Sequence, residues 1–256
     1  MLVRSSRHVA ITAEPICLPA GNPGPMTGAG TNTWLIDGAQ PALVDAGVGS
    51  AAHLDAIADA LGGRPLARLL ITHNHPDHAL GIPAICARWP EVQTVRWPWP
   101  EGEAIPSGDS SVTAIHTPGH AAEHLCFWNA DTRDLFGGDM VIAGTTVMIP
   151  AARSGGSLRE YLRSLDRLAA LDPLRILPGH GDIVRDPQAI IAAYKRHRRE
   201  REDQIRACLN DGVPAADVDA IVSRIYGGLP EGLRPAARLT VQAHLEKIAE
   251  ENGGPA

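Results

Sequence analysis

The sequence predicts a layered α/β fold, and two patterns support this prediction. Strand-like segments come first as hairpins and later alternate with amphipathic helices, which favours stacked layers over a simple alternating parallel sheet. Seven of the eleven histidines lie between residues 73 and 180, and they fall at strand ends. Loops at one edge of a sheet commonly carry binding groups, so the second pattern also indicates a site.

The first half of the chain predicts two strands, a helix, a strand, a helix and a strand, at 31–38, 41–47, 50–63, 66–73, 79–90 and 91–97. The dipeptide Asp37-Gly38 suits the turn between the first two strands. Ser50 can cap the first helix, and Gly62 can end it. Pro83 must lie in the first turn of the second helix, because proline disrupts a helix interior.

The second half predicts three strands, a leucine-striped helix, a short strand and a long helix, at 111–120, 124–131, 133–140, 154–173, 174–182 and 186–209. Asp186 and Pro187 are typical of an N-cap and a first helical position. Two short helical segments follow, near 218–225 and 241–248, with Pro230 and Pro235 between them.

These boundaries divide the chain into a domain at 1–186 and a small helical region at 187–256. The domain carries the whole net charge of −6, because Lys and Arg balance Asp and Glu in the helical region. An acidic chain argues against broad, non-specific nucleic-acid binding. The basic run at 194–206 reads as a solvated helix face with ion pairs, or else as a phosphate-contacting patch.

Composition and the N-terminal residues point to a cytoplasmic protein. Hydrophobic content is 44%, and no run of 18 apolar residues is present to cross a membrane. The first 15 residues lack the apolar core of a signal peptide. The four cysteines form no CxxC pair, which is typical of reduced core residues.

The stretch THNHPDHALG (72–81) predicts ligands for two neighbouring metals. His73 and His75 share one side of an extended segment, by the two-residue period. Pro76 then turns the chain, so Asp77 and His78 can point to a second location. Three further candidates follow, each beside a glycine: His120, Asp139 and His180. Five imidazoles and two carboxylates suit zinc, tolerate iron or manganese, and disfavour calcium.

The order of these motifs, HxHxDH, HTPGH, GD and PGHG, resembles the metallo-β-lactamase superfamily over nearly all of 1–186. The resemblance implies a four-layer αββα sandwich with two zinc ions at one sheet edge. It also implies which residues bind each ion: His73, His75 and His120 the first, Asp77, His78 and His180 the second, with Asp139 bridging both.

Three other residues match positions beside the ligands. Asp45, in LVDAG, fits an early Asp-Gly motif of the superfamily and is expected to anchor a ligand rather than bind metal. His116 and His124 flank His120. We expect them to support ligating imidazoles by fixing their tautomer and orientation.

The resemblance implies a hydrolase that works through a metal-bridging hydroxide. Two zinc ions about 3.5–4 Å apart would lower the pKa of a shared water toward ~7, and the hydroxide would attack a carbonyl or a phosphorus. Asp77 is the expected catalytic residue, orienting the hydroxide. The sequence contains no GxSxG motif for a serine nucleophile.

The bond that is cut stays open between two hypotheses. The tail (197–205 and 218–253) resembles the winged-helix-like tail of the β-lactamase-like protein 2 subgroup, whose eukaryotic members are similar to single-strand-specific endoribonucleases. The alternative is a carboxylic substrate: a thioester, as in glyoxalase II, a lactone or a β-lactam.

Candidate substrate contacts and partners follow from the same comparison. Trp97 and Trp99 could stack a base or an acyl group, or pack as a lid. Arg153 and the basic residues of the tail could contact phosphate, or lie on a solvated surface: Lys195, Arg196, Arg198, Arg199 and Arg201. The expected partner is a small molecule or single-stranded RNA, with no membrane. A homodimer is one arrangement that the sequence leaves open.

Overall fold

Two five-stranded sheets stacked face to face form the centre of the computed structural model, which describes residues 14–253. The first sheet has the order β1-β2-β3-β4-β5. Its first three strands are antiparallel, and β4 and β5 run parallel to β3. The strands are β1 (Ile16–Pro19), β2 (Asn32–Ile36), β3 (Ala42–Val44), β4 (Arg68–Leu70) and β5 (Gln93–Val95).

The second sheet has the order β10-β9-β8-β7-β6. Strands β6 to β9 are antiparallel neighbours, and β10 pairs parallel to β9 at the opposite edge from β6. The strands are β6 (Ala104–Ser107), β7 (Ser110–His116), β8 (Leu125–Asn129), β9 (Asp134–Gly138) and β10 (Arg175–Pro178). The short strands β1 and β6 were not predicted, and each lies at the edge of its sheet.

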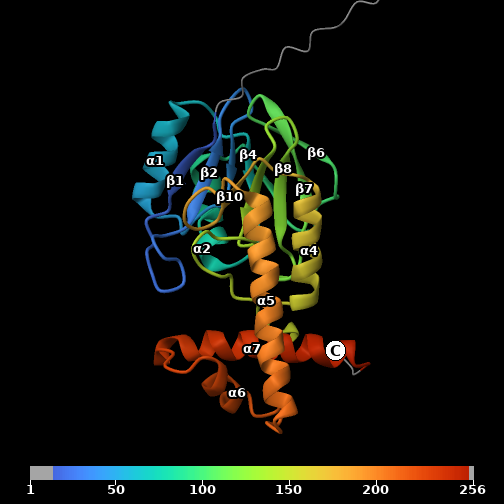
Figure 1. Ribbon diagram of the computed structural model, residues 1–256. Coiled ribbons are helices and arrows are strands. Elements are labelled where there is room, and N and C mark those ends of the chain that lie inside the picture. Colours follow the sequence, from blue (N-terminus) through green and yellow to red (C-terminus); the bar gives the residue numbers. More distant parts are fainter. Residues whose placement is uncertain (1–13, 254–256) are drawn as a thin grey trace, which may run out of the picture.

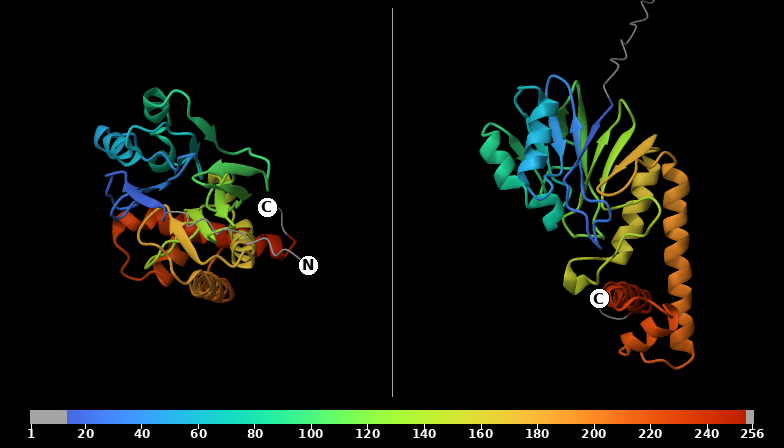
Figure 2. Two further views of the ribbon diagram at one scale, coloured as in Figure 1. Left: turned by 90° about the horizontal axis from the view of Figure 1, so that it is seen from above. Right: turned by 90° about the vertical axis from the view of Figure 1, so that its left-hand side faces the viewer.

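Helices cover the outer face of each sheet, which gives the predicted four layers (Figures 1 and 2). Residues from both sheets, such as Val44 and Phe127, share the central core. A second core joins the first sheet to α1 (Ala51–Leu61) and α3 (Ile82–Arg88), and a third joins the second sheet to α4 (Leu158–Ala170) and α5 (Pro187–Asn210).

The predicted helix at 79–90 corresponds to α3, and a separate one-turn helix, α2 (Pro76–Ala79), comes before it. Gly81 lies between them, where an added Cβ would stand 2.2 Å from the carbonyl oxygen of Ala46. The chain therefore breaks at the point where it presses against the loop after β3. Pro83 does lie in the first turn of α3, as predicted.

The C-terminal region consists of helices, with its own apolar core between α5, α6 (Val218–Ile225) and α7 (Arg234–Glu251). A short 3-10 turn, Glu231–Leu233, lies between α6 and α7, and another, Ala152–Ser154, comes earlier in the chain, before α4. The last helix is longer than predicted, because Pro235 lies in its first turn, where the missing N–H costs nothing. Within residues 14–253 no strand follows β10.

Other expectations fare differently. No helix in the described range is long and apolar enough to cross a membrane. Most of the N-terminal segment read as lacking a signal peptide lies outside the described residues. The cysteines are all free, but only Cys126 and Cys208 are buried; Cys17 is exposed, so it is not a core residue.

Candidate metal centre

The seven predicted metal ligands gather at one edge of the sandwich, in segments that follow strands. His73 and His75 follow β4, and His120 follows β7. Asp139 directly follows β9, and His180 comes two residues after β10. Asp77 and His78 lie in α2, the short helix that begins just after His75. The strand ends therefore bring together residues that lie more than 100 positions apart in the sequence.

The first group consists of three imidazoles whose nitrogens meet around His75. The Nδ1 atom of His75 lies 2.9 Å from Nε2 of His73 and 2.9 Å from Nε2 of His120. All three ligand atoms lie within 4.8 Å of one another. Such a cluster suits a single cation at its centre.

The second group consists of one carboxylate and two imidazoles. Oδ2 of Asp77 lies 3.1 Å from Nε2 of His180 and 3.2 Å from Nε2 of His78. The two Nε2 atoms are 3.3 Å apart. These three groups form a second set that could hold a metal ion.

Asp139 lies between the two groups and offers one oxygen to each. Its Oδ2 is 3.7 Å from Nε2 of His120 in the first group. Its Oδ1 is 3.4 Å from Nε2 of His78 and 3.5 Å from Nε2 of His180 in the second. The carboxylate is thus placed to contact an ion in each group.

Backbone and side-chain oxygens fix which nitrogen of each imidazole faces the centre. Nδ1–H of His120 donates to the Met148 carbonyl (2.9 Å), and Nδ1–H of His180 donates to the Gly30 carbonyl (3.1 Å). Nδ1–H of His78 donates to the carboxylate of Asp45 (2.7 Å). In each ring Nε2 is the atom that faces the other ligands, and it must be free of a proton to bind a metal.

These contacts show that the residues fit a pair of metal ions. Because Nε2 of His120 carries a lone pair, a proton on Nδ1 of His75 could satisfy only one of its two close nitrogen contacts. Oδ1 of Asp139 is buried without a hydrogen-bond partner among the described residues. A buried carboxylate oxygen without a hydrogen bond is unfavourable unless a cation, such as a metal ion, lies beside it.

Asp45 supports the site through Thr72, the residue before His73. Its carboxylate accepts hydrogen bonds from the backbone N–H (2.8 Å) and the hydroxyl (2.9 Å) of Thr72, as well as from His78. The Thr72 hydroxyl oxygen in turn contacts Nδ1 of His73 at 3.0 Å. Asp45 has a left-handed backbone (φ 65°), a strained conformation that costs about 1–3 kcal/mol and is typical of functional sites. One carboxylate therefore anchors a ligand of each group.

Neighbouring charges shift the pKa values of several groups in the site. Burial would lower the pKa of His78, but the neighbouring Asp139 and Asp45 raise it well above its usual value, so a metal ion bound there would replace a proton on Nε2. Burial alone would raise the pKa of Asp139, but the neighbouring His78 holds it well below its usual range. Burial would likewise raise the pKa of Asp77, and hydrogen bonds from His180 and His78 lower it. Burial, together with the neighbouring His78, holds the pKa of His73 well below its usual value. The carboxylates are thus anions and His73 is neutral near pH 7.

Two glycines allow the strand ends to approach the ligands. At Gly138 the backbone has φ 47°, and an added Cβ would stand 2.7 Å from Nε2 of His124. At Gly179 it would stand 2.7 Å from Oδ1 of Asp139. Neither position tolerates a side chain without moving a ligand or the residue that holds it.

The two histidines predicted to support the ligands differ. His124 is buried, contacts the Thr117 hydroxyl through Nδ1 (2.8 Å), and accepts the backbone N–H of Asp139 at Nε2 (3.2 Å). It therefore orients the bridging residue. His116 bonds instead to the carbonyl of Ala122 (2.8 Å) and stacks on Trp97, with ring centroids 3.8 Å apart. We therefore assign His116 to the contact with Trp97 and not to the support of the metal ligands.

The predicted substrate contacts do not point into the metal centre. Trp99 is half-buried and packs against the core between the sheets. Trp97 is 39% exposed and stacked on His116. Arg153 donates to Gln242 of α7 (2.6 Å), so its guanidinium contacts the C-terminal helix. Of the two tryptophans, Trp97 is the more exposed.

The basic residues of α5 are largely engaged within the protein. Lys195 pairs with Asp166, and Arg201 lies over the ring of Tyr226, 4.1 Å from its centroid. Arg198 is buried, which corrects the expectation that it lies on a solvated or phosphate-contacting surface. Arg196 and Arg199 are exposed as expected.

Several supporting residues were missed by the sequence reasoning. The Thr31 hydroxyl donates to Oδ2 of Asp77 (3.0 Å). Asn32 Nδ2 donates to the carbonyls of Pro178 (3.1 Å) and Gly181 (2.9 Å), which flank His180. All of these contacts run from the start of β2 to the metal centre, and the one available signal was the polar pair Thr31-Asn32 at the start of a predicted strand.

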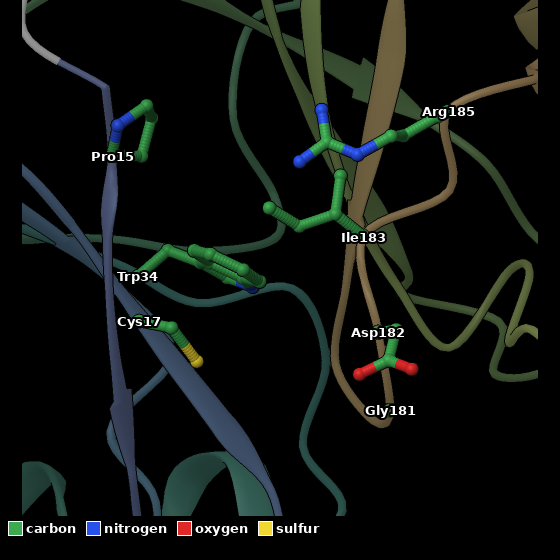
Figure 3. A pocket seen from close by; sticks show the side chains of 7 residues that line it. All are labelled: Pro15, Cys17, Trp34, Gly181, Asp182, Ile183 and Arg185. Carbon is green, nitrogen blue, oxygen red and sulfur yellow. The ribbon is translucent and has the colours of Figure 1, made fainter.

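A pocket of about 550 Å³ lies behind the loop that carries His180 (Figure 3). Trp34 forms part of its wall, and its Nε1–H donates to the Pro178 carbonyl (2.9 Å). Cys17 and Arg185 also line it, but none of the seven predicted ligands does. The pocket is therefore separate from the metal centre, although it shares the β2 contacts that hold the His180 loop.

Comparisons with known proteins agree with this geometry. The family model of the metallo-β-lactamase superfamily matches residues 26–101 and 95–180. The model of the β-lactamase-associated winged helix domain matches residues 218–252, which form α6 and α7. The predicted resemblance in both parts of the chain is confirmed.

Individual proteins give the same result over most of the chain. It is 30% identical over 275 residues to a β-lactamase-like protein 2 homolog of Drosophila melanogaster, covering 94% of this chain and 89% of that protein. It is 30% identical over 259 residues to an atrochrysone carboxyl ACP thioesterase of Aspergillus chevalieri, covering 93% and 82%.

A solved structure extends the likeness to the whole fold. A metallo-β-lactamase family protein from Thermus thermophilus superposes with a TM-score of 0.73 at 24% identity, covering 95% of each chain. The segment 218–252, which matches the winged helix domain, is mainly helical in this protein. This chain belongs to the metallo-β-lactamase superfamily.

Proposed function

We propose that the protein is a dinuclear zinc hydrolase that acts on a carboxylic thioester or ester. The observation that carries the proposal is the division of the donor set into two groups with Asp139 between them. His73, His75 and His120 would hold one zinc ion, and Asp77, His78 and His180 the other. When bound, such a pair supplies a hydroxide nucleophile near neutral pH and polarises the substrate oxygen.

The ligand chemistry supports zinc. Five imidazole nitrogens and two carboxylates form a nitrogen-rich set that suits zinc, with iron and manganese as weaker alternatives. The fixed Nδ1–H donors of His78, His120 and His180 support it further, because metal-binding imidazoles commonly donate their second N–H to an oxygen.

Asp77 is the proposed catalytic residue. Its Oδ2 accepts the hydroxyl of Thr31 and faces His78 and His180, and its lowered pKa keeps it a carboxylate. It can therefore accept a hydrogen bond from the attacking water and orient it. Thr31 holds the carboxylate at this position through its hydrogen bond to Oδ2, and Nε2 of His180 lies 3.1 Å from the same oxygen.

The sequence alone leaves two hypotheses open for the substrate class. The thioester hypothesis draws support from the thioesterase relative, and the net charge of this chain, −6, argues against broad RNA binding. The RNA hypothesis requires a basic path to the metal centre. It is disfavoured by the engagement of Lys195 with Asp166 and of Arg153 with Gln242, and by the burial of Arg198.

The test is a parallel assay of zinc-loaded protein against an acyl-carrier or acyl-pantetheine thioester, a lactone, a chromogenic cephalosporin and single-stranded RNA. Each assay includes a chelator control and the His75→Ala variant, which removes the nitrogen at the centre of the first group. We expect chelator-sensitive thioester turnover that His75→Ala abolishes. Chelator-sensitive RNA cleavage without thioester turnover would replace the thioester assignment, and less than about one metal ion per chain would contradict the dinuclear site.

A further inference from the structure

Arg198, on α5, is a buried cation that the hydrolytic site does not explain. The residue is 3% exposed, whereas the neighbouring Arg199 is exposed. Its Nη2 donates to the backbone carbonyl of Val147, and its Nε has no hydrogen-bond partner among the described residues. Removing a guanidinium from water without a paired carboxylate is costly, so the contact with Val147 requires a reason.

Two tyrosines lie beside this contact and bond to the same segment of chain. The guanidinium carbon of Arg198 lies 5.7 Å from the ring centroid of Tyr161, whose hydroxyl donates to the Met140 carbonyl (2.6 Å). The Tyr194 hydroxyl donates to the Ile142 carbonyl (2.9 Å) and accepts the Ile142 N–H (3.0 Å). We call Tyr161, Tyr194 and Arg198 the clamp.

The segment that the clamp holds, 140–148, connects two parts of the metal centre. It begins directly after Asp139, the residue between the two groups. It ends at Met148, whose carbonyl accepts the Nδ1–H of His120 (2.9 Å). Residues 143–146 are exposed and contain no helix or strand, so regular backbone pairing does not fix the segment. The clamp contacts the segment on both sides of 143–146, at Met140, Ile142 and Val147.

We propose that Arg198 is a positioning residue for the metal centre, acting through Val147 and Met148 on His120. This inference rests on the proposed function, because it assigns His120 to a metal. The carbonyl of Val147 belongs to the peptide unit that joins Val147 to Met148, so fixing it restrains the residue whose own carbonyl accepts the Nδ1–H of His120. That carbonyl holds the proton on Nδ1 of His120 and leaves Nε2 free to bind.

The same contacts give the C-terminal region a role. Helix α5 runs from the sandwich to α6 and α7 (Figure 1), and it carries Tyr194 and Arg198 along its path. Helix α7 braces the adjoining turn, because Glu246 accepts the N–H of Ala152 (2.8 Å). The helical region is thereby coupled to the ligand set instead of forming an independent module.

The test compares Arg198→Met with Arg199→Met, the exposed neighbour, in the full-length chain. Metal affinity is measured by competition with a chromophoric chelator, and the coordination by the visible spectrum of the cobalt-substituted protein. Loss of a residue that supports a ligand typically weakens metal binding about 10–100-fold. We expect a loss of about 10-fold in the binding of one of the two ions, with an altered cobalt spectrum, for Arg198→Met alone.

Two further variants keep the inference falsifiable if Arg198→Met fails to fold. Arg198→Lys retains the charge and should restore part of the affinity, and Tyr194→Phe should produce a smaller loss in the same ion. Unchanged affinity and spectrum in the folded variants, with only a lower unfolding temperature, would overturn the positioning role. If the unaltered protein binds no metal, the proposed function itself fails. If it binds metal and the folded variants bind it equally well, only the positioning role fails, so the two failures are distinguishable.

Discussion

The metal edge and the C-terminal helices both concentrate titratable side chains, but they do so in opposite ways. At the edge, five imidazoles and two carboxylates converge, and Oδ1 of the buried Asp139 has no hydrogen-bond partner among the described residues. In the helices, Glu202 accepts hydrogen bonds from Lys247 (2.8 Å) and Arg206 (2.9 Å), so opposite charges cancel. The difference indicates that the edge is arranged to take a cation, whereas the charges around Glu202 are already balanced by protein groups.

The largest effect that would test this comparison is removal of metal. We expect a strong chelator to abolish hydrolysis and to lower the unfolding temperature, since the close nitrogens of His73, His75 and His120 would lose their common partner. Zinc should restore both. Full activity in protein shown by metal analysis to be metal-free would contradict the assignment of the edge.

Next in size is the change Asp45→Asn, which keeps the shape of the side chain but removes one acceptor and the negative charge. His78 and Thr72 would lose their shared anchor, so metal affinity should fall about 10–100-fold. Chelator competition measures the change. Asp55→Asn, at an exposed carboxylate paired with Arg88, is the control and should leave affinity unchanged.

A smaller effect on stability is expected from Glu202→Gln. The nearby His244, whose Nδ1 lies 3.9 Å from the carboxylate, and hydrogen bonds from Lys247 and Arg206 lower the pKa of Glu202 to about 2. A lowered folded-state pKa stabilises the protein above the unfolded value of about 4.3, and this contribution is lost as pH falls toward about 2.

Allowing for solvent screening, the substitution should lower the free energy of unfolding by about 1–2 kcal/mol at pH 7. Urea unfolding of the variant and the unaltered protein should converge between about pH 4.3 and about pH 2. Glu231→Gln, whose side chain is 92% exposed, serves as control. A difference that persists unchanged at the acidic end would show that Glu202 does not act through its charge.

The smallest effect is expected from Arg196→Gln combined with Arg199→Gln on the exposed face of α5. If the helices only support the edge, thioester turnover should change by less than about twofold, as for surface substitutions in general. RNA binding whose salt dependence weakens in this variant would contradict that role, because phosphate contacts impose a strong dependence on salt.

Local chemistry in the sequence predicted much of the fold and the site. Ser50 and Asp186 do cap their helices, accepting the backbone N–H of His53 (3.3 Å) and Ala189 (3.0 Å). The ligands of HxHxDH could be predicted because they lie within six consecutive residues, 73–78. In contrast, the sequence did not show that the helix predicted from residue 79 would begin only after Gly81, since the close contact there involves the distant Ala46 carbonyl.

Residues whose role depends on burial were beyond reach of sequence reasoning. Arg198 stands in a basic run that is indistinguishable, residue by residue, from its exposed neighbours. Its helix face turns inward only because α5 packs against α4 and the 140–148 segment. Thr31 and Asn32 likewise acquire their contacts from strand pairing and from the loop that carries His180.

The sequence by itself determined the kinds and numbers of donor groups, and so the superfamily and the preference for a nitrogen-binding metal. Only the tertiary structure decided which nitrogen of each imidazole faces the centre and which part of the chain holds it there. The physical reason is that the anchors of His120 and His180 are backbone carbonyls, at Met148 and Gly30. Every residue has a carbonyl, so no side chain in the sequence announces which one will accept the proton.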